Sequence, residues 1–306
     1  MVWESLLKEG DRVLGHYGHA RRSKYQIFQS KVPFPIGGGV FRYSGCDWEG
    51  DMGLTQEQRA DFETKGWFVL GAVFEEAELE EMRGEYDRIL EKPMSIGEAG
   101  KRPFSYSPLL HLQSPTMCRY ACDRRLVEVA TELIAPDIRL YWDQAVNKPA
   151  GATSDVPWHQ DNGYTPVLPE EYLTFTIALD ATTEQNGCLW IQPGSHRQGV
   201  VPHTPTDMLF FRGYEGDDPG VPVPQAEGDV LCFSSLTMHR TGPNKTEGPR
   251  RSWVIQHCDA ATYHRETGEL FDDRLLLSRD GETLDSPERQ KPFDVSKLVK
   301  AAKKAR

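Results

Sequence analysis

The chain has 306 residues, a formal net charge of −11, 38% hydrophobic residues and 26% charged residues. This composition is ordinary for a globular protein, and the acidic balance disfavours nucleic acid and anionic membrane surfaces as partners. The sequence contains no run of 18 or more apolar residues, so we expect no membrane-spanning helix.

The N-terminal sequence and the cysteines favour a cytoplasmic location. The first residues lack the charged lead, the apolar run and the small-residue cleavage site of a secretory signal. The six cysteines are scattered along the chain, and none belongs to a CxxC pair. We therefore expect reduced thiols rather than a disulfide framework.

The first part of the chain predicts an irregular extension followed by helices. Residues 1–50 contain glycines and aromatic residues without clear periodicity. Thr55 precedes Gln58 by three residues, which is the capping-box pattern of a helix start. The elements expected next are a helix from Thr55 to near Gly66, a strand over 67–70, and helices over about 75–90 and 117–134.

From residue 138 the pattern changes to short β-type runs bounded by Gly, Pro, Asn and Asp. Many short strands separated by turns predict a sandwich or barrel rather than βαβ units. The strands are expected over 138–146, 172–179, 188–192, 230–233 and 252–258.

The expected fold is mainly β with flanking α-helices, as a double-stranded β-helix (jelly roll, cupin-like). No internal repeat or sharp change in composition divides the chain, so residues 1–306 are predicted to form a single domain. Its expected parts are an irregular N-terminal extension (1–50), a mostly helical part (51–137), a jelly-roll core (138–260) and a C-terminal extension (261–306).

A candidate metal site begins at His159 and Asp161, which lie two residues apart in the segment PWHQD. Residues i and i+2 of a strand point to the same face, so the imidazole and the carboxylate would converge. His239, which follows the strand expected over 230–233, is the best third ligand. Two His and one carboxylate leave coordination positions open, which suits iron(II) and oxygen chemistry. An HxD pair alone is a weak signal, because a surface His beside an Asp gives the same pattern.

Arg250 follows His239 by 11 residues across a turn-rich loop. We expect the two flanking strands to be adjacent and antiparallel, which would return Arg250 to the neighbourhood of the metal. A guanidinium there can bind a carboxylate through two parallel hydrogen bonds, which a Lys cannot do. The alternative is a surface salt bridge, which contributes little to stability.

Several segments together carry a family resemblance. They are WHQD at 158–161, QNGCLWIQPGSH at 185–196, EGDVLCF at 227–233 and HRTGPNKTEGPRRSW at 239–253. With the helix and strand expected within 54–74, they resemble the phytanoyl-CoA dioxygenase family of iron(II)/2-oxoglutarate oxygenases. The resemblance covers about residues 54–260, and the combined motifs are far more specific than any one of them.

The resemblance implies a set of ligands and a reaction. The family's metal triad maps onto His159, Asp161 and His239, and its 2-oxoglutarate arginine maps onto Arg250. Arg251 is the rival, although in a strand it would point to the opposite face. The implied cofactors are Fe(II), 2-oxoglutarate and O2, and the implied reaction is hydroxylation with release of succinate and CO2. Because Asp161 is present, we expect oxygenation rather than the chemistry of related halogenases, which have a small residue there.

Further cosubstrate contacts are expected at Gln144, Thr176 and Thr241. Gln144 lies in the strand before the first metal motif, and Thr176 stands where many relatives carry Trp. Each of these residues is as easily explained as an ordinary polar residue of a strand.

Other residues are candidates for the substrate pocket, and most have a structural alternative. His111, Tyr106, Trp158 and Tyr164 are the candidates, although aromatic side chains are more often part of a core. His196 and His203 are expected on the surface or in hydrogen-bonding roles outside the triad.

A small organic metabolite is the expected substrate, and the oligomeric state is left open. A CoA thioester would favour a basic entry patch, for which Arg102, Arg124, Arg125, Arg197 and Arg212 are available. Two alternatives remain: a jelly-roll metalloenzyme that does not use 2-oxoglutarate, and a non-catalytic binding module.

Overall fold

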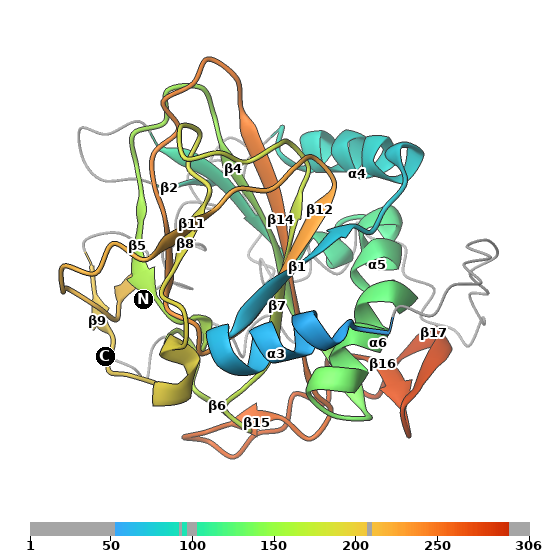
Figure 1. Cartoon of the computed structure of the whole chain (residues 1–306). Helices are drawn as coiled ribbons and strands as arrows, with labels where there is room; N and C mark the ends of the chain where they lie inside the picture. Colours follow the sequence, from blue (N-terminus) through green and yellow to red (C-terminus); the bar gives the residue numbers. More distant parts are fainter. Residues whose placement is uncertain (1–52, 92–93, 97–102, 207–209, 294–306) are drawn as a thin grey trace, which may run out of the picture.

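The computed structural model describes residues 53–91, 94–96, 103–206 and 210–293. Two antiparallel sheets, one large and one small, lie face to face, and helices cover the outer side of the large one (Figure 1). This arrangement is the predicted jelly roll. The predicted extension over 1–50 lies outside the described residues.

The large sheet forms the frame of the molecule. Its main strand order is β1-β12-β7-β14-β4-β16-β17, and β3 pairs with both β4 and β2. The strands are β1 (Trp67–Ala72), β2 (Met94–Ile96), β3 (Phe104–Pro108), β4 (Ile138–Lys148), β7 (Leu173–Ala178), β12 (Asp229–Ser234), β14 (Arg250–Asp259), β16 (Leu275–Arg279) and β17 (Glu282–Arg289). Part of the predicted C-terminal extension therefore adds two strands to this sheet.

The small sheet has the order β11-β8-β13-β5. Its strands are β5 (Val156–His159), β8 (Leu189–Ile191), β11 (Val221–Val223) and β13 (His239–Thr241). Leu189 and Ile191 pack against Leu231 and Phe233 of the large sheet, which holds the two sheets together. Two short ribbons join β9 (Thr204–Pro205) to β10 (Phe211–Arg212), and β6 (Val167–Leu168) to β15 (Tyr263–His264).

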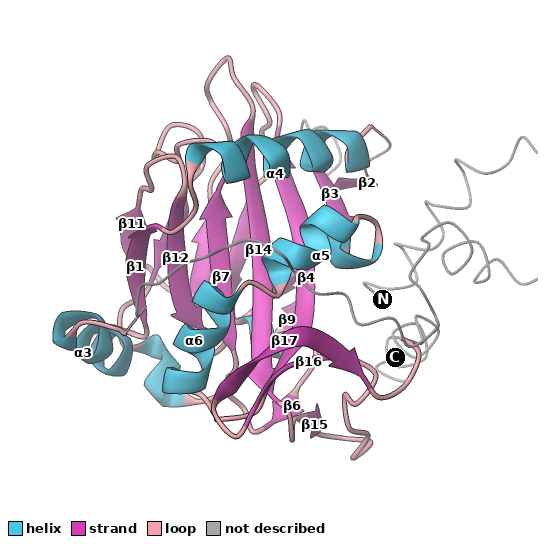
Figure 2. Cartoon of the chain, turned by 90° about the vertical axis from the view of Figure 1, so that its right-hand side faces the viewer, coloured by secondary structure: helices cyan, strands magenta, loops and turns pink. Residues whose placement is uncertain are grey.

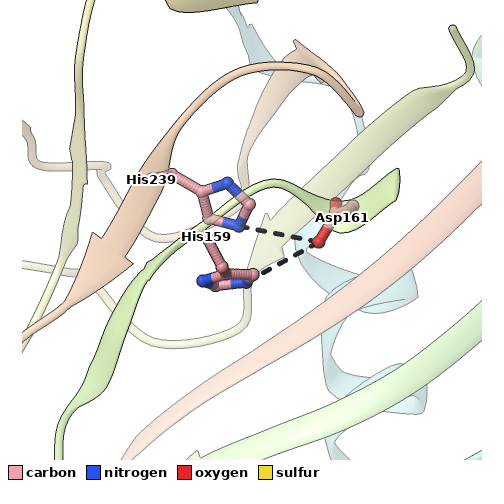
Figure 3. Close-up of side chains that lie close together, drawn as sticks. All are labelled: His159, Asp161 and His239. Atoms are coloured by element: carbon pink, nitrogen blue, oxygen red, sulfur yellow. Dashed lines mark ion pairs between the residues drawn. The ribbon is translucent and has the colours of Figure 1, made fainter. Parts of the chain in front are cut away.

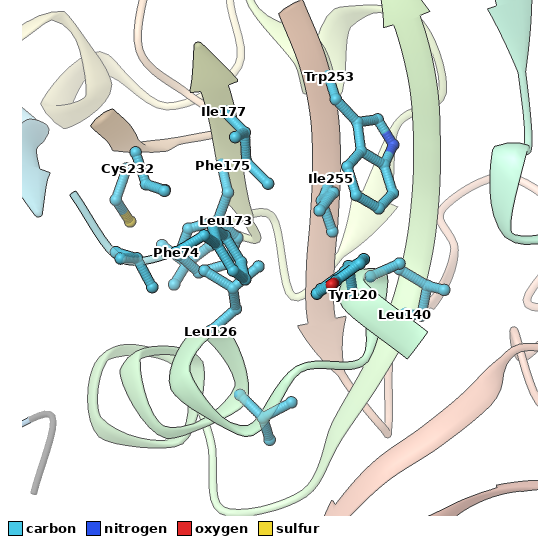
Figure 4. Packing of buried hydrophobic residues seen from close by; sticks show 14 of the residues in the cluster. Phe74, Tyr120, Leu126, Leu140, Leu173, Phe175, Ile177, Cys232, Trp253 and Ile255 are labelled. Carbon is cyan, nitrogen blue, oxygen red and sulfur yellow. The ribbon is translucent and has the colours of Figure 1, made fainter. Parts of the chain in front are cut away.

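Helices bury the outer face of the large sheet (Figure 2). They are α3 (Gln56–Lys65), α4 (Glu76–Ile89), α5 (Pro115–Ala121) and α6 (Arg124–Leu133). Phe175 and Ile177 of β7, with Trp253 and Ile255 of β14, point into this core (Figure 4). Since side chains alternate along a strand, the residues between them face the small sheet. None of these helices is long and apolar enough to cross a membrane.

Most of the expected elements are present, and one is wrong. The capping box of Thr55 and Gln58 is formed in both directions at the start of α3. The helix expected over 117–134 is instead two helices, α5 and α6. The chain breaks there because the Asp123 carboxylate accepts a hydrogen bond from the backbone N–H of Arg125 and so begins a new helix.

Candidate active site

His159, Asp161 and His239 converge on one point between the two sheets (Figure 3). His159 ends β5 and His239 begins β13, and the two residues are directly paired in the small sheet. The Asp161 Oδ1 atom lies 3.8 Å from Nε2 of His159 and 3.7 Å from Nε2 of His239. One nitrogen or oxygen from each side chain lies within 4.8 Å of the others, a spacing that fits one metal ion.

The reason for this convergence differs from the predicted one. Asp161 is not in a strand, because β5 ends at His159 and Asp161 opens the 3₁₀ turn η2 (Asp161–Gly163). Gln160 between them is still extended, with φ −107° and ψ 140°, so the two ligands project to the same side.

Backbone carbonyls orient both imidazoles. Nδ1 of His159 lies 2.8 Å from the carbonyl oxygen of Pro157, and Nδ1 of His239 lies 2.9 Å from that of Thr237. A proton on each Nδ1 leaves each Nε2 lone pair free for a metal. Burial and the nearby His239 hold the pKa of His159 well below its usual range, which keeps this ring neutral.

Two residues of the large sheet orient the carboxylate. Asp161 Oδ2 accepts hydrogen bonds from Thr174 Oγ1 at 2.5 Å and from Gln256 Nε2 at 3.0 Å. Thr174 and Gln256 are cross-strand partners on β7 and β14. Oδ2 is therefore occupied, and Oδ1 is the oxygen that faces the imidazoles. Neither supporting residue was predicted from the sequence.

Arg250 lies on the same face of β14 as Gln256, with its guanidinium buried. Its Nη1 donates to Ser252 Oγ at 2.6 Å, so the side chain leans along the strand towards Gln256. Its Nε and Nη2 are buried and have no hydrogen-bond partner among the residues that the structure describes. A buried N–H without a partner is costly unless a ligand accepts from it. Burial also lowers the pKa of Arg250.

The prediction that the strands flanking the loop before Arg250 are neighbours is wrong, although Arg250 still faces the space between the sheets. Strands β13 and β14 are not neighbours, because β13 pairs with β5 and β8 while β14 pairs with β4 and β7. The loop between them crosses from the small sheet to the large one. Arg251 points to the opposite face and forms ion pairs with Asp87 and Asp180.

A second buried basic side chain, Lys148, pairs directly with Arg250 across β4 and β14. The side chain is completely buried, and its Nζ donates to the carbonyl oxygens of Ser154 and Gly242. Burial and the neighbouring Arg250 hold the pKa of Lys148 well below its usual range. Lys148 was not predicted from the sequence, since a Lys at a strand end is usually exposed.

Comparison with known proteins identifies the family. Residues 62–252 match the family model described as "Phytanoyl-CoA dioxygenase (PhyH)", which is more than half of the chain. The chain belongs to the phytanoyl-CoA dioxygenase family. Members of this family use Fe(II), 2-oxoglutarate and O2, so the chain is an Fe(II)- and 2-oxoglutarate-dependent dioxygenase.

Individual relatives differ in their substrates. The human peroxisomal phytanoyl-CoA dioxygenase is 26% identical over 279 residues, which is 82% of each chain. The ectoine dioxygenase of Sphingopyxis alaskensis is 26% identical over 265 residues, 77% of this chain and 86% of the relative. The crystal structure of the epimerase SnoN in complex with Fe3+, alpha ketoglutarate (2-oxoglutarate) and a nogalamycin compound has a TM-score of 0.61 and 25% identity, covering 78% of this chain and 94% of SnoN.

Three further predicted contacts of this family member face the space between the sheets. Gln144 Oε1 accepts from Tyr106 Oη and from Trp142 Nε1, both at 2.8 Å, so its amide nitrogen is left to donate to a ligand. Thr176 is buried on the same face of β7 as Thr174. The hydroxyl of Thr241 is buried, and no described residue forms a hydrogen bond with it.

The structure separates the four substrate-pocket candidates. Tyr164 lies beside the metal site, with its ring centroid 5.3 Å from that of His159. Tyr106 faces the same space through Gln144. His111 lies elsewhere: it is buried against Asp143, which also accepts from Trp253 in the helix-covered core. Trp158 points away from its neighbour His159 and contacts Arg240 on the outer side of the small sheet.

Proposed function

We propose that this dioxygenase oxidises a small organic metabolite at an iron(II) held by His159, Asp161 and His239, with 2-oxoglutarate anchored by Arg250. One observation carries the proposal. Arg250 presents two buried nitrogens, Nε and Nη2, that have no partner within the described part of the chain, on the strand whose Gln256 supports Asp161. A carboxylate is the natural acceptor for a guanidinium fork.

The residues fit the metal in its donor set. Two neutral imidazole nitrogens and one carboxylate oxygen form a set that suits iron(II) and leaves positions for other ligands. When bound, the iron supplies the oxidative chemistry with O2 and 2-oxoglutarate. The chain keeps Nε2 of both His unprotonated, and Thr174 and Gln256 hold the Asp161 carboxylate in one orientation.

The far carboxylate of 2-oxoglutarate would lie at the cation pair of Arg250 and Lys148. Thr241 supports this placement, since its buried hydroxyl has no partner in the part of the chain that is described, and the carbonyl oxygen of the next residue, Gly242, accepts from Lys148. Gln144 offers an amide N–H to a bound oxygen, with its own oxygen fixed by Tyr106 and Trp142. Such preset donors bind an anion without first being reorganised.

A compact substrate without a phosphate tail is the second part of the proposal. Three of the arginines available for a basic entry patch are each paired with a carboxylate, namely Arg124, Arg125 and Arg212. Tyr164 instead places aromatic surface beside the metal site, and Tyr106 contacts Gln144 on the same face of the large sheet. Hydroxylation is the simplest outcome. A cytoplasmic location and independence from nucleic acid belong to the same proposal and are supported by the sequence composition.

The decisive experiment loads the protein with iron(II) under anaerobic conditions and adds 2-oxoglutarate. The expected result is a weak visible charge-transfer band that is absent in Asp161→Ala and in Arg250→Ala. If iron binds and no band forms, the alternative of a jelly-roll metalloenzyme that does not use 2-oxoglutarate replaces this proposal. If no iron binds, a non-catalytic binding module replaces it.

A further inference from the structure

We infer that Gln160 and His203 are positioning residues that fix the three proposed iron ligands relative to one another. The inference rests on the proposed metal site. Gln160 lies between His159 and Asp161, its side chain is completely buried, and none of its polar atoms points to an open coordination position. Gln160 and His203 form a clamp with the backbone groups that they bind, which belong to Gly199, Val201 and Leu236.

The Gln160 amide joins three separate segments of the chain. Its Oε1 accepts from the backbone N–H of Val201 at 2.8 Å. Its Nε2 donates to the carbonyl oxygens of Gly199 at 2.9 Å and Leu236 at 2.7 Å. Leu236 lies in the turn that leads into β13, three residues before His239. The amide therefore ties the segment with two ligands to the turn that delivers the third.

His203 holds the backbone of the same residue. Its Nε2 accepts from the N–H of Gln160 at 2.9 Å, and its Nδ1 lies 2.8 Å from the carbonyl oxygen of Val201. The proton is therefore on Nδ1, and the ring bridges residues 160 and 201. Without His203, the partly buried N–H between the two ligands would lose its acceptor.

Two glycines make room for this ring. A Cβ built on Gly163 would lie 2.4 Å from the His203 ring, and one built on Gly213 would lie 2.6 Å from it. Neither glycine has a positive φ, so close approach rather than backbone strain excludes a side chain there. The imidazole is seated between backbone on two sides, which fixes the position of its acceptor nitrogen.

The clamp acts on ligand geometry rather than on general packing. Each of its five hydrogen bonds joins the side chain of Gln160 or His203 to a backbone group. The backbone N–H of Asn162 also donates to the carbonyl oxygen of Ser235 at 3.2 Å, so a further bond joins the segment of the first two ligands to the turn before His239. Loss of the clamp should therefore let the His159–Asp161 segment shift against His239, which changes iron affinity before it changes the fold.

The test compares four variants of the full chain in anaerobic iron(II) titrations, with the 2-oxoglutarate charge-transfer band as the readout. Gln160→Met and His203→Phe remove the hydrogen bonds with similar side-chain size. We expect each to weaken iron(II) binding by about tenfold and to shift the band, as substitutions behind metal ligands do. His203→Gln should recover most of the affinity, because its amide oxygen can accept from the N–H of Gln160.

His196→Phe is the matched control, because His196 lies in the same region but contacts the carbonyl of Glu63 in α3. It should bind iron(II) as the wild type does. Wild-type affinity and band position in both Gln160→Met and His203→Phe would overturn the inference, and so would equal losses in His203→Gln and His203→Phe. If Gln160→Met does not fold, the two His203 variants decide. A wild type that binds no iron(II) refutes the proposed function instead.

Discussion

The space between the two sheets has a metal end, at His159, Asp161 and His239, and a cation end, at Arg250 and Lys148. The two ends differ in whether their buried polar atoms already have hydrogen-bond partners. At the metal end, each Nδ1 of the two His ligands has a carbonyl partner, and Asp161 Oδ2 has two donors. At the cation end, two buried nitrogens of Arg250 and the buried hydroxyl of Thr241 find no partner in the described ranges. The contrast shows which contacts the chain supplies itself and which it leaves to a ligand.

The physical reason lies in what each ligand requires. A metal ion needs donor atoms in a set geometry, so the atoms that do not bind it are tied down in advance. A carboxylate contributes its own acceptors, so the donors that await it stay unpaired. Each unpaired buried group destabilises the free protein by about 1–3 kcal/mol. The cation end therefore destabilises the free protein, and binding of a carboxylate there removes that cost.

The largest effect is expected at the metal end. Asp161→Ala removes the oxygen that lies within 3.8 Å of both imidazole Nε2 atoms. Iron(II) binding and 2-oxoglutarate turnover should both be abolished, as measured by anaerobic titration and by succinate release. Asp161→Glu is the control that keeps the charge. Succinate release by Asp161→Ala at the wild-type rate would show that the metal lies elsewhere.

Arg250→Met tests the cation end and should act in two opposite directions. The KM for 2-oxoglutarate should rise by about 100-fold, because a buried charged partner is lost. The free protein should unfold at a higher temperature, because an unpaired buried cation is removed. Iron(II) affinity without 2-oxoglutarate should be unchanged.

Arg251→Met is the matched control for Arg250→Met. Arg251 is the next residue and carries the same charge, but it is paired with Asp87 and Asp180 on the outer face. It should lower thermal stability and leave the KM for 2-oxoglutarate unchanged. Equal changes in KM for both variants would remove the distinction between the two faces of β14.

The sequence predicted what depends on local spacing. The pair His159 and Asp161, the inward side of Arg250 and the capping box of α3 follow from the spacing of a few residues, and His239 follows from its place after a strand and from the family resemblance. The expected strands of the core also agree with the structure, because alternating or buried apolar runs report burial directly.

Contacts that depend on strand register could not be predicted from the sequence. Thr174 and Gln256 meet at Asp161 only because β7 and β14 pair with these residues opposite each other. Lys148 reaches Arg250 for the same reason, through β4 and β14. The misplaced strand neighbours of β13 show the same limit: a loop length does not say whether the chain stays in one sheet or crosses to the other.

A smaller effect is expected for Lys148→Met, and it depends on pH. The pKa of Lys148 is depressed in the free protein, and an anion bound beside it would raise that pKa, so binding of 2-oxoglutarate takes up a proton. Affinity should therefore weaken as the pH rises through the lowered pKa that Lys148 has in the free protein. Lys148→Met should lower the affinity by about tenfold on the acidic side of that range and flatten the pH dependence. Isothermal titration over a pH series measures both, and an unchanged slope in the variant would exclude Lys148 from the site.

Thr174→Val should have the smallest effect, and it separates orientation of the carboxylate from its presence. The substitution keeps the shape of the side chain and removes the hydroxyl that donates to Asp161 Oδ2 at 2.5 Å. Gln256 still donates to the same oxygen, so iron(II) affinity should fall by only about threefold to tenfold. Thr174→Ser, which keeps the hydroxyl, should bind iron(II) like the wild type. If Val and Ser behave alike in the anaerobic titration, Gln256 alone orients the carboxylate, and the metal end depends less on its supporting contacts than the contrast with Arg250 implies.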